Sequence, residues 1–206
     1  LIITSTHDDL LFFTDMGKVY KMKGYEVPEA SRTAKGTPVI NFLNLNSGEK
    51  VSAVIPVKEF SQDNYLVMIT RSGTIKKTPM SEFDSIRKNG LIAINLKDGD
   101  KLISVSQSNG DENIYVITKL GKAIAFNEND VRSMGRNAAG VRAINLDYGD
   151  EVVSMELDID GTREMLVVSE NGFGKRTSLD EYRLQTRGGK GIATYDKSKF
   201  SKTGTL

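Results

Sequence analysis

The stretch that decides the fold of this chain is Gln185-Thr186-Arg187-Gly188-Gly189-Lys190-Gly191. Its glycines allow positive φ angles and a close approach of the backbone to a partner. Its two cations lie beside bare backbone amides, an arrangement that suits an anion such as phosphate. A heptad of this kind also occurs as an ordinary charged turn. Its value as evidence for an anion site therefore depends on three similar but less complete segments, or echoes, elsewhere in the chain.

Each echo is a basic loop that ends in glycine. The three loops are Ser31-Arg32-Thr33-Ala34-Lys35-Gly36, Ile86-Arg87-Lys88-Asn89-Gly90 and Gly135-Arg136-Asn137-Ala138-Ala139-Gly140. Their closing glycines and Gly191 are 50 to 54 residues apart. A second series, Gly17, Gly73, Gly121 and Gly172, follows four apolar runs at intervals of 48 to 56 residues. A period near fifty residues is typical of propellers and repeat arrays.

Each repeat unit is predicted to hold four short strands, the first two joined by a glycine hairpin and the third preceded by the basic loop. We expect units at residues 8–58, 63–107, 111–158 and 162–206 of a single domain spanning 1–206. Residues 1–6 are expected to form a strand of a preceding or closing blade, and Val39-Ile40 the third strand of the first unit. Lys197 to Leu206 reads as a polar, frayed end. The predicted fold class is all-β, a propeller-like array of about four to five blades. A β-sandwich is the alternative, but it gives no reason for the repeat.

Charge is segregated within the units. The windows of second strand plus basic loop (18–36, 74–90, 122–142 and 173–191) hold 18 Lys and Arg and 8 Asp and Glu, whereas the rest of the chain holds 10 and 19. Equivalent windows of an array occupy equivalent places, so we expect the cations to form a band and the acids an opposite face. Solvated faces between apolar strands are the alternative interpretation. A local basic band suits a polyanion and predicts salt-sensitive binding.

Several kinds of chemistry are disfavoured by the residue inventory. The chain has no cysteine and a single histidine, His7, so thiol chemistry and sites with several histidines are excluded. The acidic pairs beside Gly99 and Gly149 lack the ligand density of an EF-hand loop and are interpreted as turns. No phosphate-binding loop ending in Gly-Lys-Ser/Thr is present. We therefore expect no catalytic residue, metal site or cofactor in this chain, and no membrane span.

The predicted contacts with a polyanion are the cations of the basic loops and second strands, acting by phosphate neutralisation. They are Lys21, Arg32, Lys35, Lys76, Lys77, Arg87, Lys88, Arg136, Arg142, Lys175, Arg176, Arg187 and Lys190.

The segment Tyr182 to Ile192 is similar to the Gln-Arg-Arg-Gly-Gly-Lys-Gly signature called the gyrase A box. Ser5 to Tyr20, Ser31 to Gly36 and Val131 to Arg136 resemble the same family. Over essentially its whole length the chain resembles the C-terminal, DNA-wrapping domain of the bacterial DNA gyrase A subunit, in the type IIA topoisomerase family. That resemblance implies a β-pinwheel whose blades exchange strands and whose basic perimeter wraps double-stranded DNA for negative supercoiling.

The resemblance also implies a context. The parent enzyme would be an ATP-dependent, cytoplasmic bacterial topoisomerase in which this non-catalytic part works with the gyrase A breakage-reunion core and the gyrase B subunit. Thr186 departs from the signature, which has a second basic residue there, so Gln185 to Gly191 is interpreted as a degenerate box, with the true box upstream of Leu1. A protein-interaction propeller and the C-terminal domain of a topoisomerase IV subunit remain as alternatives.

Overall fold

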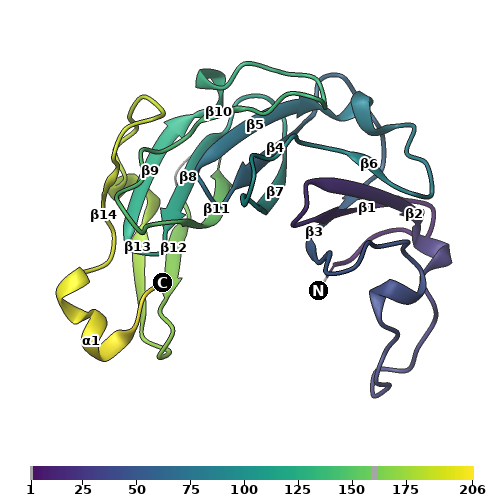
Figure 1. Cartoon of the computed structure of the whole chain (residues 1–206), viewed down its shortest axis with the longest axis horizontal. Helices are drawn as coiled ribbons and strands as arrows, with labels where there is room; N and C mark the ends of the chain where they lie inside the picture. Colours follow the sequence, from purple (N-terminus) through teal and green to yellow (C-terminus); the bar gives the residue numbers. More distant parts are fainter. Residues whose placement is uncertain (1, 159–161) are drawn as a thin grey trace.

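The computed structural model describes residues 2–158 and 162–206, whose sheets follow one another along an open arc (Figure 1). Three antiparallel sheets have four strands each, and a fourth has two. The one α-helix among the described residues is α1 (Phe200–Thr203), which has four residues. The all-β prediction is confirmed. Within the described residues, no helix is long and apolar enough to cross a membrane.

The strands fall into four groups. The first sheet holds β1 (Asp9–Thr14), β2 (Lys18–Lys23), β3 (Val51–Val57) and β6 (Leu91–Ile92). The second holds β4 (Tyr65–Thr70), β5 (Thr74–Pro79), β7 (Leu102–Ser108) and β10 (Val141–Arg142). The third holds β8 (Asn113–Thr118), β9 (Lys122–Asn127), β11 (Val152–Asp158) and β14 (Ile192–Ala193), and the fourth β12 (Glu164–Val168) and β13 (Gly174–Ser178). Short 3-10 helices are η1 (Gly24–Glu26), η2 (Val39–Asn41), η3 (Met80–Phe83), η4 (Glu128–Asp130), η5 (Leu179–Glu181) and η6 (Lys197–Lys199).

Each four-stranded sheet is built from two repeat units. The orders are β3-β1-β2-β6, β7-β4-β5-β10 and β11-β8-β9-β14, so the outermost strand always comes from the next unit along the chain. Leu91 pairs with Val19, Val141 with Ile75, and Ile192 with Ala123. Successive units are thus joined by strand exchange, as the family resemblance implies.

The hairpin glycine of one unit holds the chain that follows the exchanged strand. The carbonyl oxygen of Gly17 accepts a hydrogen bond from the amide of Ala93 at 2.8 Å, and Gly73 accepts one from Ala143 at 2.8 Å. Gly17 has φ +74°, and a Cβ there would lie 2.7 Å from the carbonyl oxygen of Ile94. The periodic glycines are therefore required by the junction between units as well as by the turn.

The hydrophobic cores lie between successive sheets. Alternate side chains of a first strand point to opposite faces, and each face packs on a different neighbour. Leu66 and Met68 of β4 pack with β1, whereas Val67 and Ile69 of the same strand pack with β8. First strands between two sheets are therefore continuous apolar runs, the pattern by which the sequence marks them.

Three expected features differ in the structure. Residues 2–5 form no strand, while residue 1 lies outside the described residues. Val39–Asn41 is the 3-10 helix η2 instead of a third strand. In neither case does an unpaired sheet edge lie beside the segment, because the free edges of β12 and β13 are at the opposite end of the arc (Figure 1). The C-terminal residues are ordered: Leu206 donates from its amide to the carbonyl of Lys119 at 3.1 Å, after η6 and α1.

Candidate nucleic-acid interface

The basic loops of the second, third and fourth units run along the outer edge of the arc. Each leads into β6, β10 or β14, the outermost strand of its sheet. Figure 1 shows β10 and β14 on the outside of the arc and β7 and β11 on the inside. Strand exchange therefore carries each loop onto the perimeter of the preceding sheet.

Five of the predicted contacts are exposed cations whose side chains have no partner among the described residues. They are Arg32, Lys35, Arg87, Lys88 and Arg142. An unpaired surface cation is available to a phosphate oxygen without first breaking an ion pair. These residues belong to the first three units.

Five other predicted contacts have weak or replaceable partners. Arg136 pairs with Glu82 at 3.4 Å, Arg176 with Glu164 at 3.1 Å and Lys190 with Asp147 at 3.9 Å. Lys175 reaches the carbonyl of Thr194 at 3.5 Å. Lys21 donates to the carbonyl of Asp84 and lies over the ring of Phe60. Exposed ion pairs contribute little stability, so these cations can exchange their partners for phosphate.

Lys76 and Lys77 are corrections, because both are buried. The ammonium of Lys76 donates to the carbonyls of Ala93 and Arg136. Burial, with a smaller contribution from the Arg136 charge, lowers the pKa of Lys76 to about 8. Lys77 lies 3.5 Å from the carboxylate of buried Glu128. Neither ammonium reaches the surface, since β5 is packed on both faces.

The repeat itself indicates that Lys76 occupies an interior position. By the register of β6, β10 and β14, Lys76 is equivalent to Tyr20 and Ile124, which are also buried. Lys76 was predicted to be a surface contact because its side chain is charged, but its position in the repeat unit is buried in every unit compared. Aligning the second strands by register separates such positions from surface ones.

The degenerate box, Gln185 to Gly191, packs against strand β9 of the third unit and against Ala143, which follows β10. The amide of Gln185 donates to the carbonyl of Ala125 at 2.7 Å, and that of Gly188 donates to Ala143 at 2.6 Å. Gly191 has φ +68°, and a Cβ there would lie 2.4 Å from the carbonyl oxygen of Ala123. The glycines of the box therefore serve its close packing on the preceding unit.

The two cations of the box have different surroundings. The guanidinium of Arg187 donates through Nε to the carbonyl of Asp130 at 2.8 Å and through Nη1 to Arg142 at 3.0 Å. Lys190 is exposed, and its one ion pair is long. Arg187 thus holds the loop in place, whereas Lys190 is free to meet a phosphate. Thr186 is exposed at the position where the signature has a basic residue.

Sequence reasoning missed two exposed arginines. Arg132 and Arg183 each lie eight residues before the closing glycine of their loop, and each follows a buried anchor, Val131 or Tyr182. Neither side chain has a partner among the described residues. Their equal distance from Gly140 and Gly191 is the signal by which they can be found.

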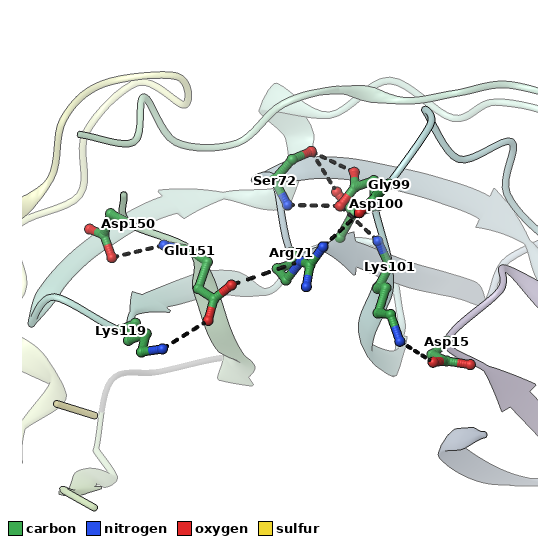
Figure 2. Close-up of polar contacts among 10 residues, drawn as sticks. Asp15, Arg71, Ser72, Gly99, Asp100, Lys101, Lys119, Asp150 and Glu151 are labelled. Carbon is green, nitrogen blue, oxygen red and sulfur yellow. Dashed lines mark hydrogen bonds and ion pairs between the residues drawn. The ribbon is translucent and has the colours of Figure 1, made fainter. Parts of the chain in front are cut away.

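The acidic glycine turns lie at the start of the inner strands (Figure 2). Asp100 accepts hydrogen bonds from the Ser72 hydroxyl and from the amides of Ser72 and Lys101. Burial opposes its ionisation, but these hydrogen bonds prevail and lower the pKa of Asp100. Asp150 accepts from the Thr118 hydroxyl in the same way. The interpretation of these acids as turn residues is confirmed.

Ion pairs join the residues after these turns to hairpin turns, two of them between units and one within the third unit. Lys101 meets Asp15 at 2.8 Å, and Glu151 lies 3.8 Å from Arg71 and 3.3 Å from Lys119 (Figure 2). The inner edge therefore holds neutralised pairs, while the unpaired cations of the second and later units lie at the outer edge. This separation follows the charge segregation of the sequence.

Comparison with known proteins identifies the family to which this chain belongs. The family described as DNA gyrase C-terminal domain, beta-propeller, matches residues 8–58, 64–109, 112–157 and 163–206. The chain belongs to this family. The DNA gyrase A subunit of Staphylococcus epidermidis is 50% identical over 196 residues, covering 94% of this chain and 22% of that protein. The corresponding protein of Staphylococcus aureus is 48% identical with the same coverage. The chain thus spans about a fifth of the length of these relatives.

Solved structures of gyrase-type domains share the fold. The C-terminal domain of a DNA topoisomerase IV gives a TM-score of 0.84 at 30% identity, covering 92% of this chain and 59% of that chain. A DNA gyrase A C-terminal domain gives 0.81 at 32% identity, covering 98% and 64%. The propeller-like fold and the family resemblance are therefore confirmed.

Proposed function

We propose that this chain binds double-stranded DNA without sequence preference along the outer edge of the arc and wraps a segment of it. The observation that carries the proposal is the recurrence of unpaired or weakly paired exposed cations in the basic loops of all four units, three of which run along the outer edge. We call the cations of those three loops the outer basic edge; its members are Arg87, Lys88, Arg132, Arg142, Arg183 and Lys190, and Arg32 and Lys35 of the first unit's loop add to them.

The chemistry of the outer basic edge suits phosphate rather than bases. Arginine and lysine donate to phosphate oxygens, and these contacts fix position without reading sequence. Base readout in the major groove needs a helix or a two-stranded ribbon that enters it. The longest helix in the described part of the chain has four residues. Binding is therefore governed by charge and depends steeply on salt.

Wrapping requires contacts along a path. Bending 20–30 base pairs by 40–90° costs roughly 1–6 kcal/mol, and a single basic loop cannot offset that cost at every point. Units repeated around an arc present one loop after another, so the DNA gains contacts as it bends. Four further cations have weak partners that they can exchange for phosphate, so they add contacts along this path. They are Lys21, Arg136, Lys175 and Arg176.

We infer that the parent protein is a bacterial, cytoplasmic DNA gyrase A subunit. In that setting the wrapped segment serves negative supercoiling, with ATP-dependent strand passage carried out by the breakage-reunion core and gyrase B. The identity of 48–50% to gyrase A proteins over most of the chain favours this assignment. A topoisomerase IV subunit is the second candidate, supported by the TM-score of 0.84.

The proposal is tested by measuring binding of several unrelated duplexes by fluorescence anisotropy over a range of salt concentrations. We expect equal affinities for all duplexes and a linear fall of log K with log salt, at about −0.9 per phosphate neutralised. The double variant Arg87→Glu/Lys88→Glu should weaken all duplexes alike and flatten the slope. Lys58→Glu/Lys97→Glu is the matched control, because it makes the same charge change at exposed residues outside the perimeter loops. Equal losses in both variants would contradict a localised edge.

Wrapping itself is measured by ligating nicked plasmid with bound protein and counting the linking-number shift per molecule. We expect a small shift of constant sign that Arg87→Glu/Lys88→Glu reduces at equal occupancy. Binding without any shift would leave DNA binding standing and reject wrapping.

A further inference from the structure

One carboxylate lies among three lysines beside the outer strand of the third sheet. Asp147 is 2.7 Å from the ammonium of Lys122 and 3.9 Å from those of Lys190 and Lys197. The lysines come from three segments: the start of β9, the basic loop before β14, and η6 after β14. Strand exchange brings them together, because β14 of the fourth unit pairs with β9 of the third. We call Lys122, Lys190 and Lys197 the lysine cluster.

The lysine cluster belongs to one of the three junctions between successive units. Positions at the same distance from the periodic glycines are Thr74, Ala139 and Leu146 at the second junction, and Lys18, Asn89 and Leu96 at the first. The position of Asp147, two residues before its turn glycine, holds Lys97 in the second unit and Asn46 in the first. The repeat fold is therefore built without such a cluster at two junctions, so the charges of the third are not a requirement of the fold.

Asp147 leaves the lysine cluster with an excess of positive charge. Its single carboxylate faces three ammonium groups. Asp196, the acid next to Lys197 in the sequence, instead accepts hydrogen bonds from Ser198 and lies 4.0 Å from Lys199. The hydrogen bond from Lys122, together with the charges of Lys190 and Lys197, lowers the pKa of Asp147. Asp147 is therefore ionised at neutral pH and holds a place that suits an anion.

The lysine cluster is continuous with the outer basic edge, because Lys190 belongs to both. The strand between Lys190 and Lys197 is β14, which lies on the outside of the arc (Figure 1). The side chains of Lys190 and Lys197 are 70% and 48% exposed, whereas that of Lys122 is 19% exposed. A phosphate at the outer edge can therefore reach two of the lysines at once, while Lys122 lies deeper and is held by Asp147.

We propose that the lysine cluster is a phosphate site on the path of the DNA, and that Asp147 is an internal competitor which occupies it. The inference rests on the proposed function, since wrapped duplex supplies the phosphate. Carboxylate and phosphate oxygens accept the same charge-assisted hydrogen bonds from ammonium groups. Lys190 and Lys197 exchange Asp147 for a DNA phosphate, whereas Lys122 remains with Asp147. The carboxylate thereby limits how tightly the duplex is held at this point of the arc.

The variant Asp147→Asn tests the competition, because it removes the negative charge and keeps the size of the side chain. Asp98→Asn is the matched control; it makes the same change of charge at an exposed acid in the equivalent turn of the second unit. In anisotropy titrations at low salt, we expect Asp147→Asn to bind every duplex about two- to fivefold more tightly than Asp98→Asn. The slope of log K against log salt should be steeper by about 0.9, for one more phosphate neutralised.

Replacing Lys122 in two backgrounds separates competition from a general change of charge. In the wild type Lys122 is committed to Asp147, so Lys122→Gln should change DNA affinity by less than about twofold. In the Asp147→Asn background the same replacement should cancel most of the gain. Lys18→Gln, at the equivalent position of the first sheet, is the control and should have the same effect in both backgrounds.

A further variant leaves Asp147 unchanged, so it is decisive even if Asp147→Asn does not fold. Lys197→Gln should weaken binding of all duplexes and flatten the salt slope by about 0.9. Lys58→Gln is its control, since Lys58 is exposed outside the basic loops. Urea unfolding of each variant separates an effect on DNA binding from an effect on the fold.

Three results would overturn the proposal. They are an Asp147→Asn variant that binds no more tightly than Asp98→Asn, a Lys122→Gln effect that is equal in both backgrounds, and a Lys197→Gln loss no greater than that of Lys58→Gln. In each case the wild type would still bind DNA and Arg87→Glu/Lys88→Glu would still weaken it. Failure of this inference is therefore distinguishable from failure of the proposed function.

Discussion

The guanidinium of Arg187 donates to the carbonyl oxygen of Asp130 at 2.8 Å, which fastens the basic loop of the fourth unit to the third. A second bond, to Arg142 at 3.0 Å, strengthens the same tie. One of the two cations in the heptad therefore shapes the loop, and the other, Lys190, faces solvent. Position within the loop decides whether a cation holds the protein together or is free to meet DNA.

Replacing the two cations of the heptad separately should separate these roles. Arg187→Ala should lower the free energy of unfolding by about 1–3 kcal/mol, because it removes two hydrogen bonds from a charged donor. Lys190→Ala should change it by less than about 0.5 kcal/mol, yet flatten the salt dependence of DNA binding by about one phosphate. Urea unfolding and anisotropy titrations check both. Equal free energies of unfolding for the two variants would show that the hydrogen bonds of Arg187 contribute nothing to stability.

Restoring the basic residue of the signature should add a contact. Thr186 is exposed beside the tied arginine, so Thr186→Arg adds a cation without disturbing the packing. We expect tighter binding of every duplex, with the slope of log K against log salt steeper by about 0.9. Thr186→Gln is the control for side-chain length. A gain shared by both variants would assign the effect to size instead of charge.

Lys76 should give stability a distinct pH dependence. Its pKa lies at about 8 in the folded chain, below its ordinary value of about 10.4, so between these values the unfolded chain binds more protons. The free energy of unfolding should therefore rise with pH through this window, by up to about 1.4 kcal/mol per pH unit.

The Lys76→Met variant isolates this contribution. Denaturant titrations from pH 8 to 10 should show the rise in the wild type and a flatter curve in the variant. The window ends at pH 10 because Tyr20, whose pKa burial and Glu49 raise to about 12, contributes with the opposite sign above it. Parallel curves would mean that Lys76 keeps an ordinary pKa.

Gly191 and Gly36 form a matched pair for testing the junction. Both have positive φ, so alanine strains the backbone at either site. A Cβ at Gly191 would lie 2.4 Å from the carbonyl of Ala123, whereas one at Gly36 would meet nothing within 4 Å. We expect Gly36→Ala to cost about 1–2 kcal/mol and Gly191→Ala about 1–3 kcal/mol more, measured by urea unfolding. Equal losses would show that backbone strain alone requires these glycines.

Much of the fold is readable from the sequence because its units repeat. Glycines at a fixed period mark turns, and apolar runs mark strands buried on both faces. Val39 and Ile40 were misassigned because a strand needs an edge to pair with, and no sequence pattern reports whether that edge is present. Likewise, the packing between units decides which sheet β6, β10 and β14 join. Only the family resemblance suggested that they join the sheet of the preceding unit.

The candidate interface was predicted less completely than the fold. Arg87 and Lys88 are exposed as expected, but Lys76 and Lys77 read as surface cations and are buried. A charged side chain in an alternating strand carries no mark of which neighbour it faces. Carbonyl acceptors such as those of Ala93 and Arg136 are invisible in a sequence, because every residue has one.

Strand exchange also sets an order for biogenesis. As the chain leaves the ribosome, the first sheet lacks its outer strand until Leu91–Ile92 emerges, after most of the second unit has been made. Folding therefore runs one unit behind synthesis, and the newest sheet always exposes an unpaired edge. A translational pause anywhere in the array would therefore leave one such edge open to nascent neighbours on the same messenger RNA.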